Sequence, residues 1–216
     1  MILRNAREWD KIFRSENSYS GRSPDHSVQT FATLLARRRI KTVCDIGCGA
    51  GRHSIYFAEM GFSVIAVDSS SSALKRLETT LKASESLNQR ITPVKADLRN
   101  LKGQFDAILC WHVLGHGTAH DILEDISYLV SLLGKKGVAL INTPSINDPR
   151  IGNKRGTAEI IQFRPKADWE RKISHTGFSK EMLRSIIEQA GAVVHKEWEE
   201  ISADMKSAHV AALLGP

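Results

Sequence analysis

Short apolar runs alternate along this chain with longer amphipathic segments. Runs rich in β-branched residues predict buried parallel strands, and apolar residues three to four positions apart predict the helices between them. Strands are expected at residues 42–46, 64–67, 91–95, 105–111 and 138–144, and helices after residue 52, from about residue 70 and from Asp121, the expected N-cap. This alternation predicts a doubly wound α/β fold with a mostly parallel sheet.

The two ends of the chain depart from this pattern. Residues 1–38 predict a helical cap, with Trp9, Ile12 and Phe13 on one face of a short helix. Toward the other end, Ser179 predicts the N-cap of a helix. An antiparallel strand pair is expected after that helix, at 193–201 and 207–214.

The segment between residues 145 and 174 has no clear period and is rich in proline and glycine. A loop of this length in a compact domain is usually functional or disordered, and we expect a lid-like insertion over 145–178. A turn is expected just before the fifth strand, at residues 134–137. The chain as a whole predicts one domain over 1–216, with its core at 40–216.

Composition indicates a soluble, cytoplasmic protein. Hydrophobic residues make up 42% of the chain, and no run approaches the roughly 18 apolar residues of a membrane span. The first residues lack the apolar region of a signal peptide. The three cysteines form no C-x-x-C pair, which favours reduced thiols over a disulfide framework or a zinc site. The net charge of +6 comes from scattered basic residues and does not by itself indicate a nucleic-acid partner.

The stretch V-C-D-I-G-C-G-A-G-R at residues 43–52 carries the clearest chemistry. Its glycines permit a sharp turn where a ligand approaches the main chain, and the N–H groups that begin the next helix would face that ligand. Asp68 follows about 20 residues later, where dinucleotide-binding folds place a ribose-binding acid. However, Arg52 replaces the third glycine of G-x-G-x-x-G, and Asp45 suits a cationic ligand better than a pyrophosphate.

The motif D-x-G-C-G-x-G, followed by an acid that closes the second strand, resembles the class I S-adenosylmethionine-dependent methyltransferases. The N-terminal W-x-x-x-F and Y-x-G-x-x-P patterns also resemble small-molecule enzymes of the tellurite-resistance type. Trp9 and Tyr19 are therefore expected either to close over the ligand or to pack the cap on the sheet. The resemblance implies a Rossmann-like seven-stranded sheet, S-adenosyl-L-methionine as cofactor, and in-line methyl transfer to a small-molecule acceptor.

The resemblance also implies a role for each cofactor-binding segment. Asp68 is expected to bind the ribose hydroxyls, Asp97 the adenine amino group, and Arg52 with the glycine-loop N–H groups the methionine carboxylate. Trp111 is expected either near the sulfonium or as a core aromatic residue that closes the fourth strand. The predicted cofactor-binding residues are Asp45, Gly47, Cys48, Gly49, Gly51, Arg52, Asp68, Ser69, Ala96, Asp97, Leu98, Cys110 and Trp111.

The acceptor is expected at the ends of the fourth and fifth strands, beneath the lid. An acidic hydroxyl, thiol or catechol-like acceptor needs a base, and histidine titrates nearest neutral pH. The catalytic candidates are His116, His112 and His175, although a loop histidine that only bonds the backbone is the alternative for each. Other residues expected around the acceptor are Asn142, Thr143, Ser145, Arg150, Arg155 and Phe163.

A metal site and three other functions compete with this interpretation. His112, His116 and His120 have the spacing of a helical metal face, but Gly115 and Gly117 interrupt such a helix, so no metal is predicted. An RNA or protein methyltransferase would use the basic surface, although the strand end C-W-H-V lacks the N-P-P-Y-like turn of nucleic-acid N-methyltransferases. A nucleotide-binding oxidoreductase is disfavoured by the glycine spacing, and a non-catalytic sensor would keep only the cofactor pocket. We expect no membrane contact, and a monomer or homodimer.

Overall fold

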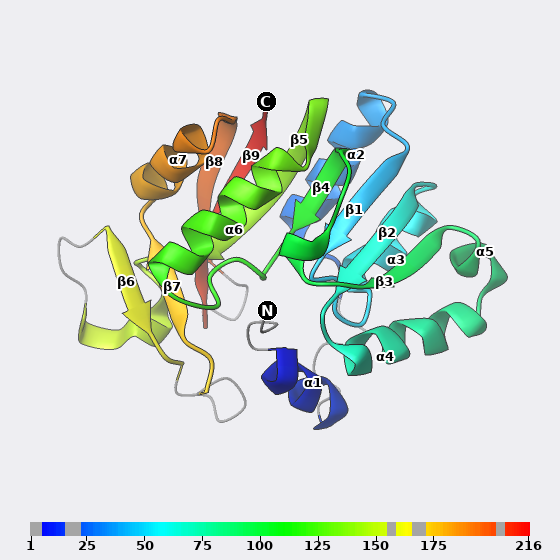
Figure 1. Cartoon of the computed structure of the whole chain (residues 1–216), viewed down its shortest axis with the longest axis horizontal. Helices are drawn as coiled ribbons and strands as arrows, with labels where there is room; N and C mark the ends of the chain where they lie inside the picture. Colours follow the sequence, from blue (N-terminus) through cyan, green and yellow to red (C-terminus); the bar gives the residue numbers. More distant parts are fainter. Residues whose placement is uncertain (1–5, 16–22, 155–158, 166–171, 202–205) are drawn as a thin grey trace. The chain divides into compact units, whose positions relative to one another are not determined.

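The computed structural model describes residues 6–15, 23–154, 159–165, 172–201 and 206–216. Its strands form a seven-stranded sheet in the order β3-β2-β1-β4-β5-β9-β8 and a separate two-stranded sheet of β6 and β7 (Figure 1). This order confirms the predicted Rossmann-like α/β fold. The chain divides into two compact units, Met1–Leu109 and Cys110–Pro216. The prediction of a single domain stays a prediction.

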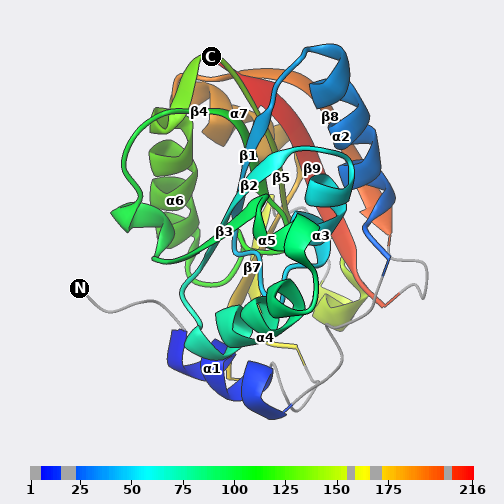
Figure 2. The same cartoon turned by 90° about the vertical axis from the view of Figure 1, so that its right-hand side faces the viewer.

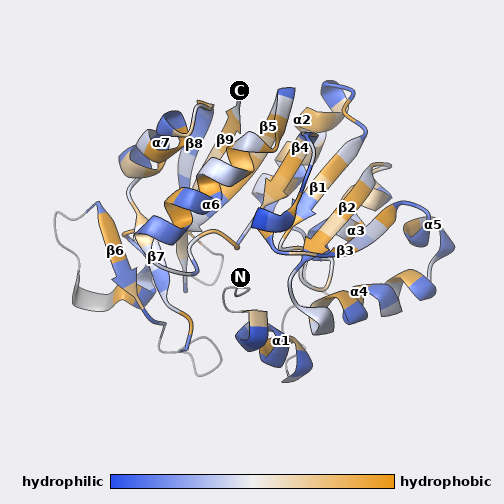
Figure 3. Ribbon diagram, in the orientation of Figure 1, coloured by the Kyte–Doolittle hydropathy of each residue, from blue (hydrophilic) through white to orange (hydrophobic). Residues whose placement is uncertain are grey.

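The strands of the first unit run parallel to one another. They are β1 (Thr42–Ile46), β2 (Ser63–Asp68), β3 (Ile91–Lys95) and β4 (Phe105–Cys110). Figure 3 shows hydrophobic colour along much of β2 and β4, as expected of strands buried on both faces. Because the strands are parallel, their carboxyl ends share one edge, and ligands bind at this edge in open α/β sheets.

The helices of the first unit are α1 (Ala6–Ser15), α2 (His26–Arg37), α3 (Arg52–Glu59), α4 (Ser71–Lys82), the short α5 (Glu85–Asn88) and the 3₁₀ turn η1 (Leu98–Asn100). Ser70 is the N-cap of α4, and its hydroxyl accepts the N–H of Ala73. The predicted helix near Trp9 is confirmed as α1, which lies beside α4 (Figures 1 and 2). Tyr19 lies outside the described residues.

The second unit contains α6 (Ala119–Ser131), β5 (Leu133–Pro144), α7 (Lys180–Gln189), β8 (Val193–Ile201) and β9 (Ala208–Gly215). β9 pairs antiparallel with both β5 and β8, which confirms the predicted C-terminal pair. Ser179 is the N-cap of α7, as predicted. Within the described chain, no helix combines the length and the apolar character needed to cross a membrane.

Two predicted boundaries in this unit are wrong. The N-cap of α6 is Thr118, and Asp121 is the third helical residue of a capping box, in which its carboxylate accepts the N–H of Thr118. The predicted turn at 134–137 is instead the beginning of β5. The glycines and lysines of that stretch are typical of turns, but this local preference does not decide the structure here.

The segment predicted as an aperiodic loop contains regular structure. It includes the 3₁₀ turn η2 (Pro149–Lys154) and β6 (Ile160–Phe163), which pairs antiparallel with β7 (His175–Phe178). The main chain of β7 also bonds the loop after β4. Gly117 donates its N–H to the carbonyl of Ser174 at 2.9 Å, and Thr176 donates to the carbonyl of Gly115 at 2.8 Å. These bonds fix the lid-like segment to the loop that carries His116.

Candidate functional site

The glycine loop leaves β1 and turns back against the end of β2. The N–H groups of Gly47 and Cys48 both donate to the carbonyl of Val67, at 2.7 and 2.9 Å. Gly51 is the N-cap of α3 and has φ of +90°, and a Cβ at this position would lie 2.4 Å from Cδ1 of Leu77. A side chain at residue 51 would therefore be strained by its backbone and would collide with α4.

Asp68 lies directly beside this loop, as its spacing predicted. One carboxylate oxygen accepts the N–H of Gly49 at 2.8 Å, and the other accepts the N–H of Ser70 at 2.7 Å. Burial raises the pKa of Asp68, while these two N–H groups oppose the rise. No cation pairs with this carboxylate among the described residues, so it retains acceptor capacity for neutral hydroxyl groups.

Asp45 is buried within β1, one residue from the loop. Its carboxylate accepts a hydrogen bond from the hydroxyl of Ser54 at 2.5 Å. Burial raises the pKa of Asp45 to about 6, although the Ser54 bond and the charge of Arg52 oppose the rise. Asp45 thus supplies a negative charge at neutral pH, and a nearby cation would stabilise that charge.

Arg52 forms a bidentate pair with Asp25, the N-cap residue of α2. Its two terminal nitrogens lie 3.1 Å from the two carboxylate oxygens of Asp25, and both side chains are partly buried. The pair connects α2 to the first residue of α3. No local pattern in the sequence marks Asp25 as the partner of Arg52. The predicted contact of Arg52 with a ligand carboxylate stays a prediction.

The third predicted cofactor segment follows β3. Asp97 is half-buried and is the N-cap of η1, where its side chain accepts the N–H of Arg99 at 3.1 Å. Ala96 donates its N–H to the carbonyl of Asp68 at 3.1 Å, so the ends of β2 and β3 are in direct contact. Ser69 and Leu98, the predicted residues that follow Asp68 and Asp97 in the sequence, are half-buried.

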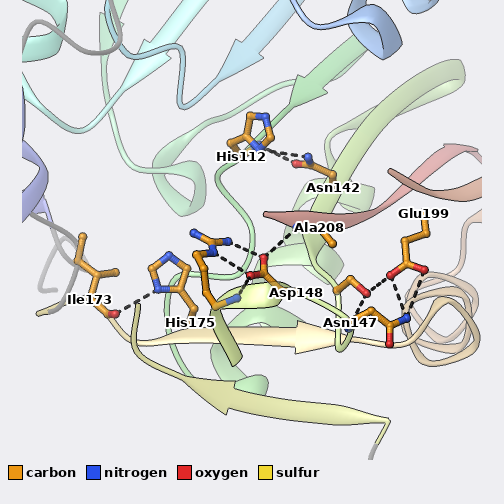
Figure 4. Close-up of polar contacts among 10 residues, drawn as sticks. His112, Asn142, Asn147, Asp148, Ile173, His175, Glu199 and Ala208 are labelled. Atoms are coloured by element: carbon orange, nitrogen blue, oxygen red, sulfur yellow. Dashed lines mark hydrogen bonds and ion pairs between the residues drawn. The ribbon is translucent and has the colours of Figure 1, made fainter. Parts of the chain in front are cut away.

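In the second unit, the end of β4 leads directly to a histidine with a left-handed backbone. Cys110 and Trp111 are buried, and the indole ring of Trp111 packs edge-to-face on His112 at 5.6 Å. His112 is exposed but has φ of +61°, a left-handed conformation that is uncommon outside glycine. Its N–H donates to Oδ1 of Asn142 at 2.6 Å (Figure 4).

His116 and His175 are far apart in the sequence but adjacent in the structure. The residues that follow them, Gly117 and Thr176, are 59 positions apart and share a hydrogen bond. The two histidine rings lie edge-to-face with centroids 4.8 Å apart. Burial, followed by the neighbouring His175 ring, lowers the pKa of His116 well below its usual range. Burial and the charge of Arg150 lower the pKa of His175 to about 4. Both imidazoles are therefore neutral at physiological pH.

A buried ion pair continues this cluster. Asp148 is fully buried, and its carboxylate accepts a hydrogen bond from the main-chain N–H of Ala208 at 3.1 Å. It also accepts hydrogen bonds from two guanidinium nitrogens of Arg150, at 2.9 and 2.8 Å (Figure 4). The Arg150 guanidinium lies 5.7 Å from the ring centre of Phe163, which in turn packs against His175. Arg150, Phe163 and His175 thus lie together, and their role around the acceptor stays a prediction. Arg155 lies outside the described residues.

Asp10, Asp25 and Asp148 were not singled out in the sequence. Each partners an N–H or a guanidinium from a distant segment, and an isolated aspartate gives no sign of such a partner. No group of three His, Cys, Asp or Glu side chains suited to a metal occurs within the described ranges. His120 is exposed and lies 3.4 Å from Glu124, one turn along α6.

Comparison with known proteins shows the family of the chain. A family model described as a methyltransferase domain matches residues 17–197. The chain is 28% identical to the glycine/sarcosine/dimethylglycine N-methyltransferase of Actinopolyspora halophila, over 68% of this chain and 25% of that protein. It is 31% identical to the magnesium-protoporphyrin O-methyltransferase of Synechocystis, over 44% of this chain and 41% of that protein.

Two solved structures share the fold of nearly the whole chain. The 1,6-didemethyltoxoflavin-N1-methyltransferase of Burkholderia thailandensis has a TM-score of 0.72 at 16% identity, covering 97% of this chain and 87% of that one. Magnesium protoporphyrin IX methyltransferase of Synechocystis has a TM-score of 0.70 at 18% identity, covering 100% and 99%. The family match spans well over half of the sequence and includes the glycine loop and Asp68. The chain belongs to the methyltransferase domain family, with the class I fold that its motifs predicted.

Proposed function

We propose that this protein transfers a methyl group from S-adenosylmethionine to a small-molecule acceptor. The observation that carries the proposal is the buried carboxylate of Asp68, at the end of β2 and bonded to the glycine loop. Family membership and the fold support the same reaction. The matched segment spans 25% to 41% of the first curated relatives, so activity and acceptor are proposed for this chain on its own residues.

The residues present fit this cofactor. Asp68 offers buried acceptor atoms to ribose hydroxyls, and Asp97 offers a half-buried carboxylate to an amino group. Asp45 places a negative charge near the glycine loop, which favours a ligand with positive charge and no phosphate. S-adenosylmethionine, when bound, supplies a methyl group already activated by a sulfonium. The protein mainly has to hold the acceptor in line and exclude water.

Proton removal from the acceptor falls to His116 or His175. The ring of His175 contacts the carbonyl of Ile173 through Nδ1, at 3.1 Å. A carbonyl only accepts, so Nδ1 carries the proton and Nε2 carries the lone pair. His116 also bonds a carbonyl, that of Val113. A neutral imidazole held in this way has one nitrogen with a lone pair that can take a proton, and burial makes this nitrogen a weak base in both rings.

A small acceptor is favoured over a macromolecule. The names of the two curated relatives state small acceptors, glycine derivatives and a magnesium porphyrin. The side chain of His116 is partly buried. The charge of Arg150 is neutralised by Asp148, so Arg150 does not extend a basic surface. A nucleic-acid or protein acceptor is therefore the alternative. The tellurite-resistance resemblance and the choice between monomer and homodimer stay predictions.

A cytoplasmic location also belongs to this proposal. Cys44, Cys48 and Cys110 are all buried, and none of them forms a disulfide bond with another described residue. Burial, with a smaller contribution from the Asp45 carboxylate, raises the pKa of Cys44 to about 12, so this thiol is unreactive at neutral pH. Buried cysteines that form no disulfide bond are typical of proteins in a reducing compartment.

Calorimetry with S-adenosylhomocysteine tests the cofactor assignment. The variant Asp68→Ala is expected to lose about 1.5–3 kcal/mol of binding free energy, because its bonds to ligand hydroxyls are charge-assisted. Asp106→Ala removes an exposed carboxylate from β4 and serves as the matched control. Circular dichroism must show both variants folded, since Asp68 also holds the N–H groups of Gly49 and Ser70. Unchanged affinity in Asp68→Ala, or tight NAD binding by the wild type, contradicts the proposal.

Turnover separates the enzyme from a non-catalytic sensor. Wild-type protein is incubated with S-adenosylmethionine carrying an isotopically labelled methyl group and with fractionated metabolite pools, and labelled products are identified by mass spectrometry. Methylated small molecules are expected. Tight cofactor binding without labelled product in any pool would favour the sensor, and label in added RNA or protein would favour the macromolecular alternative.

A further inference from the structure

Asn142 contacts two different parts of His112. Oδ1 of Asn142 accepts the main-chain N–H of His112 at 2.6 Å, and Nδ2 of Asn142 lies 3.3 Å from Nδ1 of the imidazole ring (Figure 4). The asparagine is fully buried near the carboxyl end of β5, whereas His112 is exposed. A rigid strand residue thus holds both the backbone and the ring of a loop residue.

The first contact determines which way the amide points. A main-chain N–H can only donate, so the atom that faces it must be the carbonyl oxygen of the Asn142 side chain. The amino group is then the atom beside the ring. The usual ambiguity between the oxygen and nitrogen of an asparagine side chain is removed at this position.

The amide orientation in turn determines the tautomer of His112. The amino group of Asn142 can only donate, so Nδ1 of the ring must be the acceptor and carries no proton. A neutral ring then carries its proton on Nε2. The rings of Trp111 and His209 pack edge-to-face on the imidazole of His112, with ring centroids 5.6 and 4.6 Å away, and they favour this orientation of the imidazole.

The backbone of His112 adds a second reason for the clamp. A left-handed residue other than glycine costs on the order of 1 kcal/mol and persists where the surroundings enforce it. The hydrogen bond from the buried Asn142 to the N–H of His112 is such an enforcing contact. Strain of this kind concentrates at sites where the direction of a side chain matters for function.

We propose that Asn142 is a positioning residue that holds His112 in the Nε2–H tautomer, so that His112 donates a hydrogen bond to the methyl acceptor instead of removing its proton. This inference rests on the proposed methyl transfer and narrows its substrate class. The acceptor carries a lone-pair atom, such as a carbonyl, carboxylate or ring nitrogen, next to the atom that is methylated. The proton of the acceptor passes to another group, for which His116 and His175 are the candidates.

Nuclear magnetic resonance tests the tautomer without any acceptor. Two-bond ¹H–¹⁵N correlations of protein labelled at its eight histidines distinguish the two neutral tautomers, and the signals missing from His112→Gln identify residue 112. The Nε2–H pattern is expected for the wild type. Asn142→Asp replaces the donor beside Nδ1 with an acceptor and is expected to move the ring to the Nδ1–H or doubly protonated form. An Nδ1–H pattern in the wild type overturns the proposal.

Two controls keep the spectrum interpretable. Asn88→Asp makes the same chemical change at an exposed position on α5 and is expected to leave the pattern of His112 unchanged. Asn142→Ser removes the amide without burying a charge, and a mixture of tautomers is expected in this variant. If Asn142→Asp does not fold, the wild-type pattern and Asn142→Ser still decide the assignment, and an unchanged pattern in Asn142→Ser contradicts it.

A matched pair of variants tests donation during turnover, with the labelled metabolite pools as the probe. The amide of His112→Gln can replace the Nε2–H donor but cannot act as a base, and His112→Met has similar length without a donor. We expect His112→Gln to turn over about tenfold faster than His112→Met, because only the glutamine can replace the hydrogen bond to the acceptor. Equal loss in both variants contradicts donation. If the wild type itself transfers no methyl group, the proposed function fails, and the tautomer spectrum still decides the role of Asn142.

Discussion

Asp10 on α1 accepts a hydrogen bond from the hydroxyl of Ser70 at 3.1 Å, and the N–H of Ser70 donates in turn to Asp68. The same oxygen of Asp10 accepts the N–H of Ser72 at 2.8 Å. The Ser72 backbone bond is the main reason that the pKa of Asp10 lies below its usual range. An acid from the N-terminal helix thus stabilises the N-terminus of α4, next to the predicted ribose-binding residue.

Removal of the Asp10 carboxylate is expected to loosen α1. Asp10→Ala should lower the free energy of unfolding by about 1 kcal/mol, the typical value of a helix-capping side chain. Hydrogen exchange in α1 should become faster, because its bonds to α4 are lost. Glu78→Ala removes an exposed carboxylate from α4 and is the matched control. Equal urea midpoints and exchange rates for Asp10→Ala and wild type would show that Asp10 does not hold α1.

The Arg52–Asp25 pair predicts unequal effects on cofactor affinity. Asp25 contacts two of the five N–H donors that a guanidinium carries, so Arg52 retains donors for a ligand carboxylate. We expect Arg52→Gln to weaken S-adenosylhomocysteine binding by about tenfold and Asp25→Asn to weaken it less. Arg37→Gln changes an exposed charge on α2 and should have no effect. A larger loss in Asp25→Asn than in Arg52→Gln would mean that the pair only supports the loop.

Asp97→Ala tests adenine recognition at the end of β3. The variant should bind S-adenosylhomocysteine more weakly but remain folded, because a half-buried carboxylate that caps a single 3₁₀ turn contributes little packing. The wild type should also prefer the adenosyl over the inosyl form of the cofactor product, and this preference should vanish in the variant. A preference of equal size in both proteins would assign adenine recognition to other groups.

His175 is expected to make the protein sensitive to acid. Its pKa is lowered from 6.5 to about 4 in the folded state, so folding favours the neutral ring. The neutral ring of His175 makes its full contribution to the free energy of unfolding above pH 6.5. This contribution, about 3 kcal/mol in total, is lost as the pH falls through 4. In urea titrations, the stability advantage of wild type over His175→Asn should shrink by this amount across the window. A constant difference between wild type and His175→Asn across this window would contradict the lowered pKa.

Local spacing made the cofactor side predictable. The glycines after β1, the acid at the end of β2 and the strand 91–95 are each visible in a short window, and the structure places all of them as expected. The bond between Gly49 and Asp68 follows from these elements, because parallel neighbours bring their carboxyl ends together.

The proposed acceptor side was less predictable because its contacts are not local. β6 is only four residues long, and its pairing partner begins at His175. The buried partners Asp148 and Ala208 lie 60 positions apart. No periodicity within either segment specifies such a partner. His116 and His175 could be named as candidates from their chemistry, but their edge-to-face contact required the folded chain.

The distance in sequence between β7 and the loop after β4 also affects how the chain folds. Thr176 donates its hydroxyl to the carbonyl of Gly117 across 59 positions, whereas Asp68 and Gly49 are 19 positions apart. Closing the longer loop costs more chain entropy before any contact compensates for it, and non-local contacts slow folding. During synthesis, the ribosome also releases the glycine loop and Asp68 before β7 exists. A growing chain can therefore form the bond between Gly49 and Asp68 while the pair of His116 and His175 is still incomplete.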